Sequence, residues 1–256
     1  MNPDNRKNGA PAPRVHVDAR LAPGARLILP DAIGHHLARV LRLRRGAAVV
    51  LFDGHGGEHG GVITAVGKQG IAVDVGPWND SECEATLEVH LAQGVSTGER
   101  MDYTLQKAVE LGVCGIEPVV TERSVVRLDA ERAAKRRGHW ERVCISACEQ
   151  CGRNRVPPVQ PPLDFNLWLG GPAGRNETHA LRLLLSPDAT RSLRDLPRPP
   201  GPILLLAGPE GGLTSLERSD ALRRGFCAVR LGPRVLRTET AALAALAAMH
   251  ALWGDF

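Results

Sequence analysis

The chain has 256 residues, which is enough for one large domain or two smaller ones. Hydrophobic residues make up 43% and charged residues 23%, as in ordinary globular proteins, so extensive disorder is excluded. The net charge is +4, no apolar stretch approaches the roughly 18 residues of a membrane span, and the N-terminus lacks the apolar run of a secretory signal. We therefore expect a cytoplasmic protein with no membrane partner.

The N-terminal part of the chain predicts a small β-rich module behind a disordered tail. Residues 1–13 are rich in Asn, Pro and Gly and show no periodicity, which is typical of disorder. Residues 14–78 predict short strands, three of them over 47–52, 61–66 and 71–75. These strands surround one helix, which Asp31 caps and Gly46 closes, with an apolar face made by Ile33, Leu37, Val40 and Leu41.

After a polar linker at 79–86, residues 87–256 predict an α/β domain with a mainly parallel sheet. Strands are expected over 87–92, 116–120, 181–185, 203–207 and 227–231. Helices are expected over 99–111, 129–150, 214–224 and 240–253. Thr214 and Glu217 have the spacing of a capping box.

Three loops follow strands of this domain: 185–187, 207–213 and 231–240. Ligands of open α/β sheets bind outside the carboxyl ends of the strands, so we expect a pocket there. Glycine lets a backbone approach a planar base such as adenine closely, although the same glycines suit tight strand-to-helix turns. The sequence lacks both the P-loop and the dinucleotide-binding glycine pattern, which argues against nucleotide hydrolysis and dinucleotide binding.

Two polar clusters are candidates for chemistry. Arg234, Arg237 and Glu239 precede the last helix, whose positive end disfavours two arginines unless an anion or acid compensates. Residues 149–155 place carboxylate, amide and guanidinium groups at the end of another helix, where they could hydrogen-bond an exposed base. Ordinary helix caps with surface charge are the simpler alternative for both clusters.

Basic residues are unevenly distributed along the chain. No acidic residue lies between Asp31 and Asp53, a stretch that contains Arg39, Arg42, Arg44 and Arg45, and residues 122–155 contain nine basic and five acidic residues. Such patches suggest a polyanionic partner, with a solvated charged face as the alternative.

Six cysteines in a chain without a secretory signal favour reduced thiols over a disulfide framework. Cys144, Cys148 and Cys151 have the C-x-x-x-C-x-x-C spacing with which radical enzymes hold an iron–sulfur cluster. The spacing falls within an expected helix of an α/β domain, not on a loop after the first strand of a repeated βα barrel, so we expect no metal.

Four separated motifs, in order, resemble those of the ribosomal RNA small subunit methyltransferase E family. They are residues 35–43 (HHLARVLRL), 106–112 (QKAVELG), 147–154 (ACEQCGRN) and the pair 208–212 (GPEGG) and 231–241 (LGPRVLRTETA). The resemblance runs from about Arg14 to Phe256. It implies a PUA-like RNA-binding domain followed by a SPOUT-type α/β domain with a C-terminal trefoil knot. It also implies homodimers that use S-adenosylmethionine to methylate N3 of one uridine of 16S rRNA, in the decoding region of the small ribosomal subunit.

The resemblance assigns residues to roles. It implies cofactor binding by Leu185, Gly208, Pro209, Glu210, Gly211, Leu231, Gly232, Val235, Leu236, Arg237, Thr240 and Ala241. For catalysis we expect Arg237, Arg153 and Asn154 to hold the uracil oxygens and Glu239 to orient Arg237 or take the N3 proton. For RNA binding we expect His35, Arg39, Arg42, Arg44, Arg45, Arg123 and Arg155.

Two other classes remain open at this point. A non-catalytic RNA-binding protein would share the basic patches without an adenine pocket, and a radical enzyme would contain iron.

Overall fold

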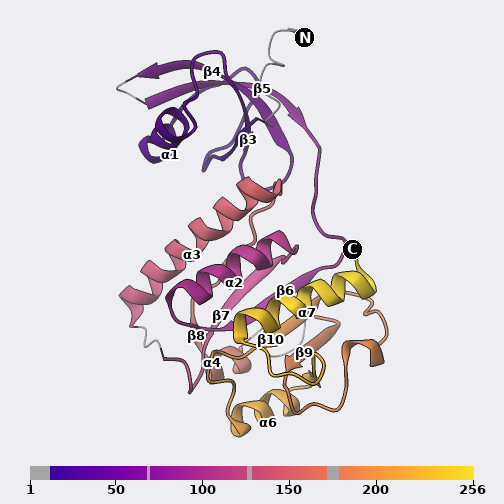
Figure 1. Ribbon diagram of the computed structural model, residues 1–256. Coiled ribbons are helices and arrows are strands. Elements are labelled where there is room, and N and C mark those ends of the chain that lie inside the picture. The colour runs from indigo at the N-terminus through magenta and orange to yellow at the C-terminus, as the bar shows by residue number, and fades with distance from the viewer. Residues whose placement is uncertain (1–11, 68–69, 126–128, 172–178) are drawn as a thin grey trace. The chain divides into compact units, whose positions relative to one another are not determined.

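The computed structural model describes residues 12–67, 70–125, 129–171 and 179–256 (Figure 1). The chain forms two compact units. The first contains the chain up to Glu84 together with the segment Cys148–Val156, and the second contains Ala85–Ala147 and Pro157–Phe256. The boundary at Glu84 falls within the linker expected at 79–86. The second domain was expected to be continuous from residue 87 to 256, whereas in the structure its segment Cys148–Val156 belongs to the first unit. Of the tail expected at 1–13, residues 1–11 lie outside the described part of the chain.

The first unit is built on a five-stranded sheet with the order β1-β3-β4-β5-β2. β1 runs parallel to β3 and the other neighbours are antiparallel. One face of the sheet is apolar, with Val15, Leu51, Ile63 and Val73 almost fully buried. The strands are β1 Arg14–His16, β2 Arg26–Leu29, β3 Ala48–Phe52, β4 Glu58–Gly67 and β5 Gly70–Asn79.

The single helix of this unit differs from the expected one. α1 covers only Asp31–His35 and continues as a π-helical turn, η2, over His36–Val40. Leu37 is buried as expected, whereas Val40 and Leu41 are 62% and 41% exposed. A π turn holds more residues per turn than an α-helix, so it rotates the following side chains off the face predicted from a 3.6-residue period. The expected apolar face was therefore wrong at these two positions.

The second unit contains a six-stranded, fully parallel sheet with the order β11-β9-β10-β6-β7-β8. Its central strand β10 is buried throughout, which explains its uninterrupted apolar sequence ILLLA. The strands are β6 Val89–Gly94, β7 Gly115–Val120, β8 Leu163–Asp164, β9 Leu181–Leu185, β10 Ile203–Ala207 and β11 Cys227–Val229. An α/β unit with a parallel sheet is therefore confirmed.

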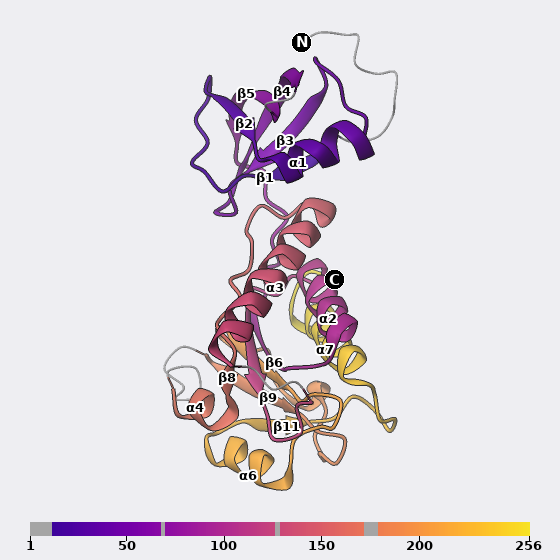
Figure 2. The ribbon, with the colours of Figure 1, turned by 90° about the vertical axis from the view of Figure 1, so that its left-hand side faces the viewer.

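Helices cover both faces of this sheet (Figures 1 and 2). α2 (Gly98–Glu110) packs against α7 (Thr238–Trp253), and α7 contacts β6 and β10. A separate core joins the sheet to α4 (Phe165–Gly170) and α6 (Ser215–Arg223) through Phe165, Trp168 and Phe226. The remaining helical elements are α3 (Ala130–Cys151) and the 3-10 turn η3 (Leu193–Asp195). Within the described ranges, no helix is long and apolar enough to cross a membrane.

Candidate functional site: a cavity at three strand ends

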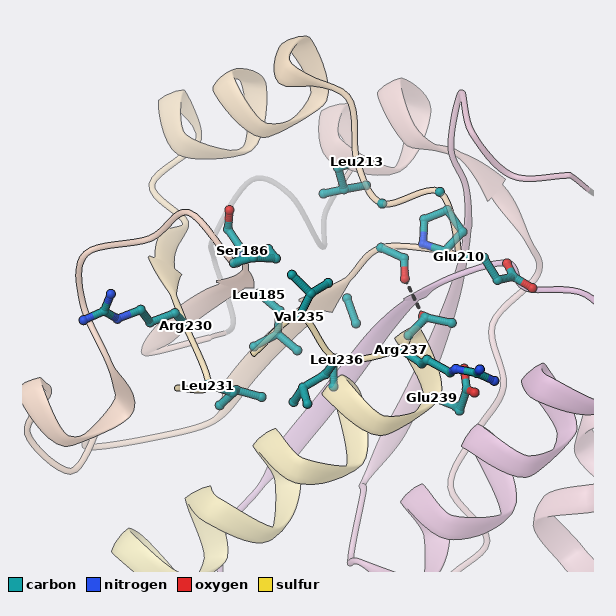
Figure 3. A pocket seen from close by; sticks show the side chains of 18 of the residues that line it. Leu185, Ser186, Glu210, Leu213, Arg230, Leu231, Val235, Leu236, Arg237 and Glu239 are labelled. Atoms are coloured by element: carbon teal, nitrogen blue, oxygen red, sulfur yellow. Dashed lines mark hydrogen bonds between the residues drawn. The ribbon is translucent and has the colours of Figure 1, made fainter. Parts of the chain in front are cut away.

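A cavity of about 460 Å³ lies in the second unit where β9, β10 and β11 end. Figure 3 shows Val235 and Leu236 directed into its middle beside Leu185 and Leu231, with Glu210, Arg237 and Glu239 gathered at one end. The three predicted loops supply most of its lining, so the position predicted from the carboxyl ends of the strands is confirmed. Its volume lies within the range of roughly 300–1,000 Å³ that is usual for small-molecule sites.

A buried hydrogen-bond network fixes the start of α7 against the loop after β10. The Thr238 hydroxyl donates to the carbonyl of Gly208 at 2.6 Å (Figure 3). The Gln93 amide donates to the Thr238 hydroxyl at 3.0 Å, and Gln93 is fully buried at the end of β6. A strand end, a loop and a helix start that are far apart in the sequence are thus held in one place.

Glu210 ties the same loop to the segment before α2. Its carboxylate accepts hydrogen bonds from the backbone amide of Thr97 at 2.9 Å and from the Thr97 hydroxyl at 2.7 Å, and Arg100 lies 3.3 Å away. Burial raises the pKa of Glu210, but the hydrogen bonds from Thr97 and Arg100 outweigh it and hold the pKa below its ordinary value. Glu210 is therefore ionised at neutral pH and fixes the loop.

A close backbone approach completes the cavity wall. A β-carbon at Gly94 would lie 2.4 Å from the amide nitrogen of Pro209, which is shorter than any real contact allows. Position 94, at the end of β6, must therefore be glycine for the Gly208–Pro209 backbone to pack this closely against it.

Of the twelve residues expected to bind cofactor, all except Thr240 line the cavity. Ser186 and Leu213, in two of the loops expected at the pocket, also line the cavity, although no role was assigned to them individually. Sequence reasoning missed other lining residues, among them Asp188, Arg218 and Arg230. Asp188 comes directly after the loop expected at 185–187, so a slightly longer loop would have included it. Arg218 lies within α6, and no sequence signal placed it at the cavity.

Arg237 and Glu239, two of the four expected catalytic residues, line the cavity. Arg237 is the residue that precedes the first turn of α7, and its side chain is exposed. Among the described residues, neither it nor Arg234 forms an ion pair, although Glu210 and Glu239 also line the cavity.

The structure places the other two, Arg153 and Asn154, in the first unit and not in the cavity lining. Arg153 is 4% exposed and pairs with Glu84 at 2.6 Å, while the Asn154 side chain donates to the carbonyl of Ser81 at 2.7 Å and accepts from Arg14. Glu84 also accepts the backbone amide of Asn154 at 3.2 Å. Both side chains are thus occupied by the packing of their own unit.

The residues expected to bind RNA fall into two groups. His35, Arg39, Arg44 and Arg45 are exposed in the first unit, as is Arg42, which lies outside the helix with a φ of +56°. Arg155 is exposed in the same unit. Arg123 belongs to the second unit, lines the cavity and donates to the carbonyl of Gly211 at 3.0 Å.

The cysteines show no arrangement for a metal. Cys144 and Cys148 are fully buried on α3, and Cys151 is half-buried at its end. In the portion of the chain that the structure describes, no group of three or more His, Cys, Asp or Glu side chains could hold a metal ion.

Comparison with known proteins assigns the chain to a family. A family described as "RNA methyltransferase domain" matches residues 83–250, and one described as "RNA methyltransferase PUA domain" matches residues 29–76. The ribosomal RNA small subunit methyltransferase E of Buchnera aphidicola (Schizaphis graminum) is 31% identical over 95% of this chain and 97% of its own length. The chain belongs to the ribosomal RNA small subunit methyltransferase E family.

Further proteins are similar to this chain in sequence and in structure. The methyltransferase E of Synechocystis is 35% identical over 89% of this chain and 74% of its own. A crystal structure of the Neisseria gonorrhoeae methyltransferase E bound to S-adenosyl methionine is 42% identical, with a TM-score of 0.86 over 96% of this chain and 99% of that one. A methyltransferase structure from Legionella pneumophila in complex with the cofactor SAM is 38% identical, with a TM-score of 0.90 over 96% of this chain and all 100% of that one.

Proposed function

We propose that this chain methylates N3 of a specific uridine in 16S rRNA, in the decoding region of the small ribosomal subunit, with S-adenosylmethionine as methyl donor. The observation that carries the proposal is the cavity formed by the three strand-end loops. Two family members of similar fold bind that cofactor. We place the activity in the cytoplasm.

The lining of the cavity fits the cofactor. Its middle is apolar, with Leu185, Val235 and Leu236, and its walls are loop backbone from Gly208–Leu213 and Leu231–Leu236. Such a mixture of apolar side chains and backbone amides and carbonyls suits an adenine and its ribose. S-adenosylmethionine bound there supplies an activated methyl group on a sulfonium.

The chain itself must prepare the uracil. Uracil N3 carries a weakly acidic proton and attacks well only after that proton has left, which places negative charge on N3, O2 and O4. We assign Arg237 to the uracil oxygens, because it is exposed at the cavity edge, carries no ion pair among the described residues and precedes the positive end of α7. Glu239, in the first turn of α7, either orients Arg237 or accepts the proton directly or through water.

Arg153 and Asn154 were expected to share the uracil contacts. In view of their burial beside Glu84 and Ser81, we propose that they act as positioning residues that shape the Cys148–Val156 segment. Arg153→Ala and Glu84→Ala should then lower activity alike, together with thermal stability. A large loss of turnover in Arg153→Ala at an unchanged melting temperature would instead support direct contact between Arg153 and the uracil.

The reaction is tested with small ribosomal subunits that lack the modification. The protein is incubated with these subunits and S-adenosylmethionine, and the digested RNA is analysed for 3-methyluridine by mass spectrometry. Appearance of that nucleoside supports the proposal, and a methyl group on another atom or on no RNA contradicts it.

The two assigned residues are tested in the same assay at saturating cofactor. Arg237→Ala removes a donor to developing charge and should lower turnover about 100-fold or more, the usual effect of losing one such donor. Glu239→Gln, which keeps the shape of the side chain but removes its charge, should also lower turnover. Arg191→Ala, an exposed arginine outside the cavity lining, is the matched control and should leave turnover unchanged.

We further propose that the chain acts as a homodimer and that its C-terminal part forms a trefoil knot. The clamp of Thr238 between Gln93 and Gly208 supports a tightly threaded C-terminal segment, and Leu252 on α7 leaves an apolar side chain exposed. Analytical ultracentrifugation measures whether the protein is a dimer in solution. Stretching a single denatured chain by its two ends tests for the knot, because a knotted chain extends to a shorter maximum length than an unknotted chain of 256 residues.

A further inference from the structure

Trp78 stands apart from the other tryptophans of the chain. The sequence contains four, and Trp140, Trp168 and Trp253 are 0%, 3% and 7% exposed. Trp78, near the end of β5 in the first unit, is 58% exposed. An aromatic ring that leaves more than half of its surface in solvent contributes less packing energy to the fold than a buried one, and the exposed part is free to contact a ligand.

The loop beside Trp78 is shaped to receive the ring. Gly57 has a φ of +66°, and a β-carbon there would lie 2.3 Å from the indole nitrogen of Trp78. Gly56 has a φ of +113°, and a β-carbon there would lie 2.6 Å from the Arg155 guanidinium. The indole and the guanidinium therefore rest on consecutive glycines, whose Cα atoms are about 3.8 Å apart.

Arg155 is held in this place by its backbone and its side chain. Residues 155 and 55 form an antiparallel bridge, and the amide of Val156 donates to the carbonyl of Gly54 at 3.1 Å. Glu82 accepts the amide of Gly57 at 2.8 Å and lies 3.6 Å from the Arg155 guanidinium. The Arg155 side chain is still 60% exposed, so it can contact an anion while it stays beside the loop.

We propose that Trp78, together with Arg155, forms a platform for one unstacked nucleotide of RNA. Trp78 is new to the residues expected to bind RNA, and the proposal rests on the proposed function in taking RNA as the ligand. The indole stacks on the base, and the guanidinium binds the adjoining phosphate. Paired bases within a helix do not expose their faces, so the platform takes single-stranded RNA and tolerates any base.

The chain offers a direct optical test, because Trp78 is its one exposed tryptophan among four. A single-stranded RNA of about ten nucleotides, end-labelled for anisotropy, is titrated into the full-length protein at low salt. Stacking should quench the tryptophan fluorescence of the wild type in step with the anisotropy. Trp78→Ala should abolish the quenching and weaken binding roughly 5- to 100-fold, the range for losing one stacked base. Trp78→Phe should weaken it less.

Two controls separate the platform from general damage. Val62→Ala removes another exposed apolar side chain of the same sheet and should leave RNA affinity unchanged. Arg155→Gln should weaken RNA binding and reduce the steepness of its salt dependence by about 0.7, the value for one phosphate contact to a single strand. Affinity for S-adenosylmethionine should stay the same in all variants.

Unchanged RNA affinity in Trp78→Ala, or bound RNA without quenching in the wild type, overturns the platform. The 3-methyluridine assay on the wild type separates this failure from failure of the proposed function. If the wild type forms that nucleoside and Trp78→Ala binds RNA normally, only the platform is wrong. If the wild type forms none but shows the quenching, the platform stands and the assigned reaction is wrong.

Discussion

At the scale of single residues, the cavity depends on side chains that keep backbone segments in place. Gly94 leaves room for Pro209, Thr238 binds the Gly208 carbonyl, and Glu210 binds Thr97. All of these contacts are made between groups of the chain itself, so they help to hold the loops in the arrangement that forms the cavity. Such preorganisation lowers the ordering cost of binding.

Gly94→Ala tests the close approach at the end of β6. The new methyl group must displace the Pro209 backbone, so we expect a loss of about 1–3 kcal/mol in the free energy of unfolding. We also expect at least a tenfold weaker binding of S-adenosylmethionine, measured by calorimetry. Gly60→Ala is the control, because a β-carbon there meets nothing within 4 Å. Equal cofactor affinity in the two variants would contradict the role of Gly94.

Glu210 gives the stability of the protein a specific pH dependence. Its pKa in the folded protein is lowered from the model-peptide value of 4.5, so its contribution to the free energy of unfolding is complete above that value and is lost as the pH falls through the folded pKa. Urea denaturation between about pH 5 and pH 3 should show a smaller decline for Glu210→Gln than for the wild type. Glu99→Gln, an exposed carboxylate on α2, should behave like the wild type.

At the scale of elements, the sequence predicted the α/β unit well because its signals are local. The apolar runs 181–185 and 203–207 are β9 and β10, and the loops after them, of which the second is rich in glycine, line the cavity. Signals that depend on tertiary context failed. Val40 and Leu41 fit an α-helical period but lie at and just after the end of a π turn, where they are exposed. The burial of Arg153 beside Glu84 was not foreseen either, because the two residues lie far apart in the sequence.

The capping box of α6 was predicted from sequence and is confirmed. Thr214 accepts the amide of Glu217 at 3.2 Å, and Glu217 accepts the amide of Thr214 at 2.8 Å. Glu217 also accepts the amide of Glu122 at 2.9 Å, so it joins α6 to the segment after β7.

Thr214→Ala removes half of the capping box and should lower the free energy of unfolding by about 1 kcal/mol. Ser215→Ala, exposed at the next position, should cost much less. Glu217→Ala should cost more than Thr214→Ala, because it also leaves the Glu122 amide unpaired. Chemical denaturation measures all three, and the reverse order for Thr214 and Glu217 would refute the second role of Glu217.

At the scale of the whole molecule, the cavity and the basic residues expected to bind RNA lie in different units. The second unit contains the cavity, and the first contains the exposed basic residues His35, Arg39 and Arg42. Sequence patterns found both parts, but they did not assign Cys148–Val156 to the first unit. That assignment depends on contacts such as the Glu149 carboxylate with the amide of His16 at 3.0 Å, which no periodicity encodes.

Replacing Arg39 and Arg42 with Gln should separate RNA binding from cofactor binding. We expect the double variant to bind RNA more weakly, with the salt dependence less steep by about 0.7–0.9 for each lost phosphate contact. Affinity for S-adenosylmethionine should be unchanged in calorimetry. A parallel loss of both affinities would contradict the division of labour between the units.

The assignment of Cys148–Val156 to the first unit has a consequence for biosynthesis. Residues up to Glu84 leave the ribosome first, yet Arg14, the backbone amide of His16 and the Glu84 carboxylate all form hydrogen bonds with residues 149–155. The first unit therefore cannot complete these contacts until more than half of the chain has been translated. A fragment that ends at Glu84 would leave the Glu84 carboxylate without Arg153, so a single cut there does not yield the complete first unit.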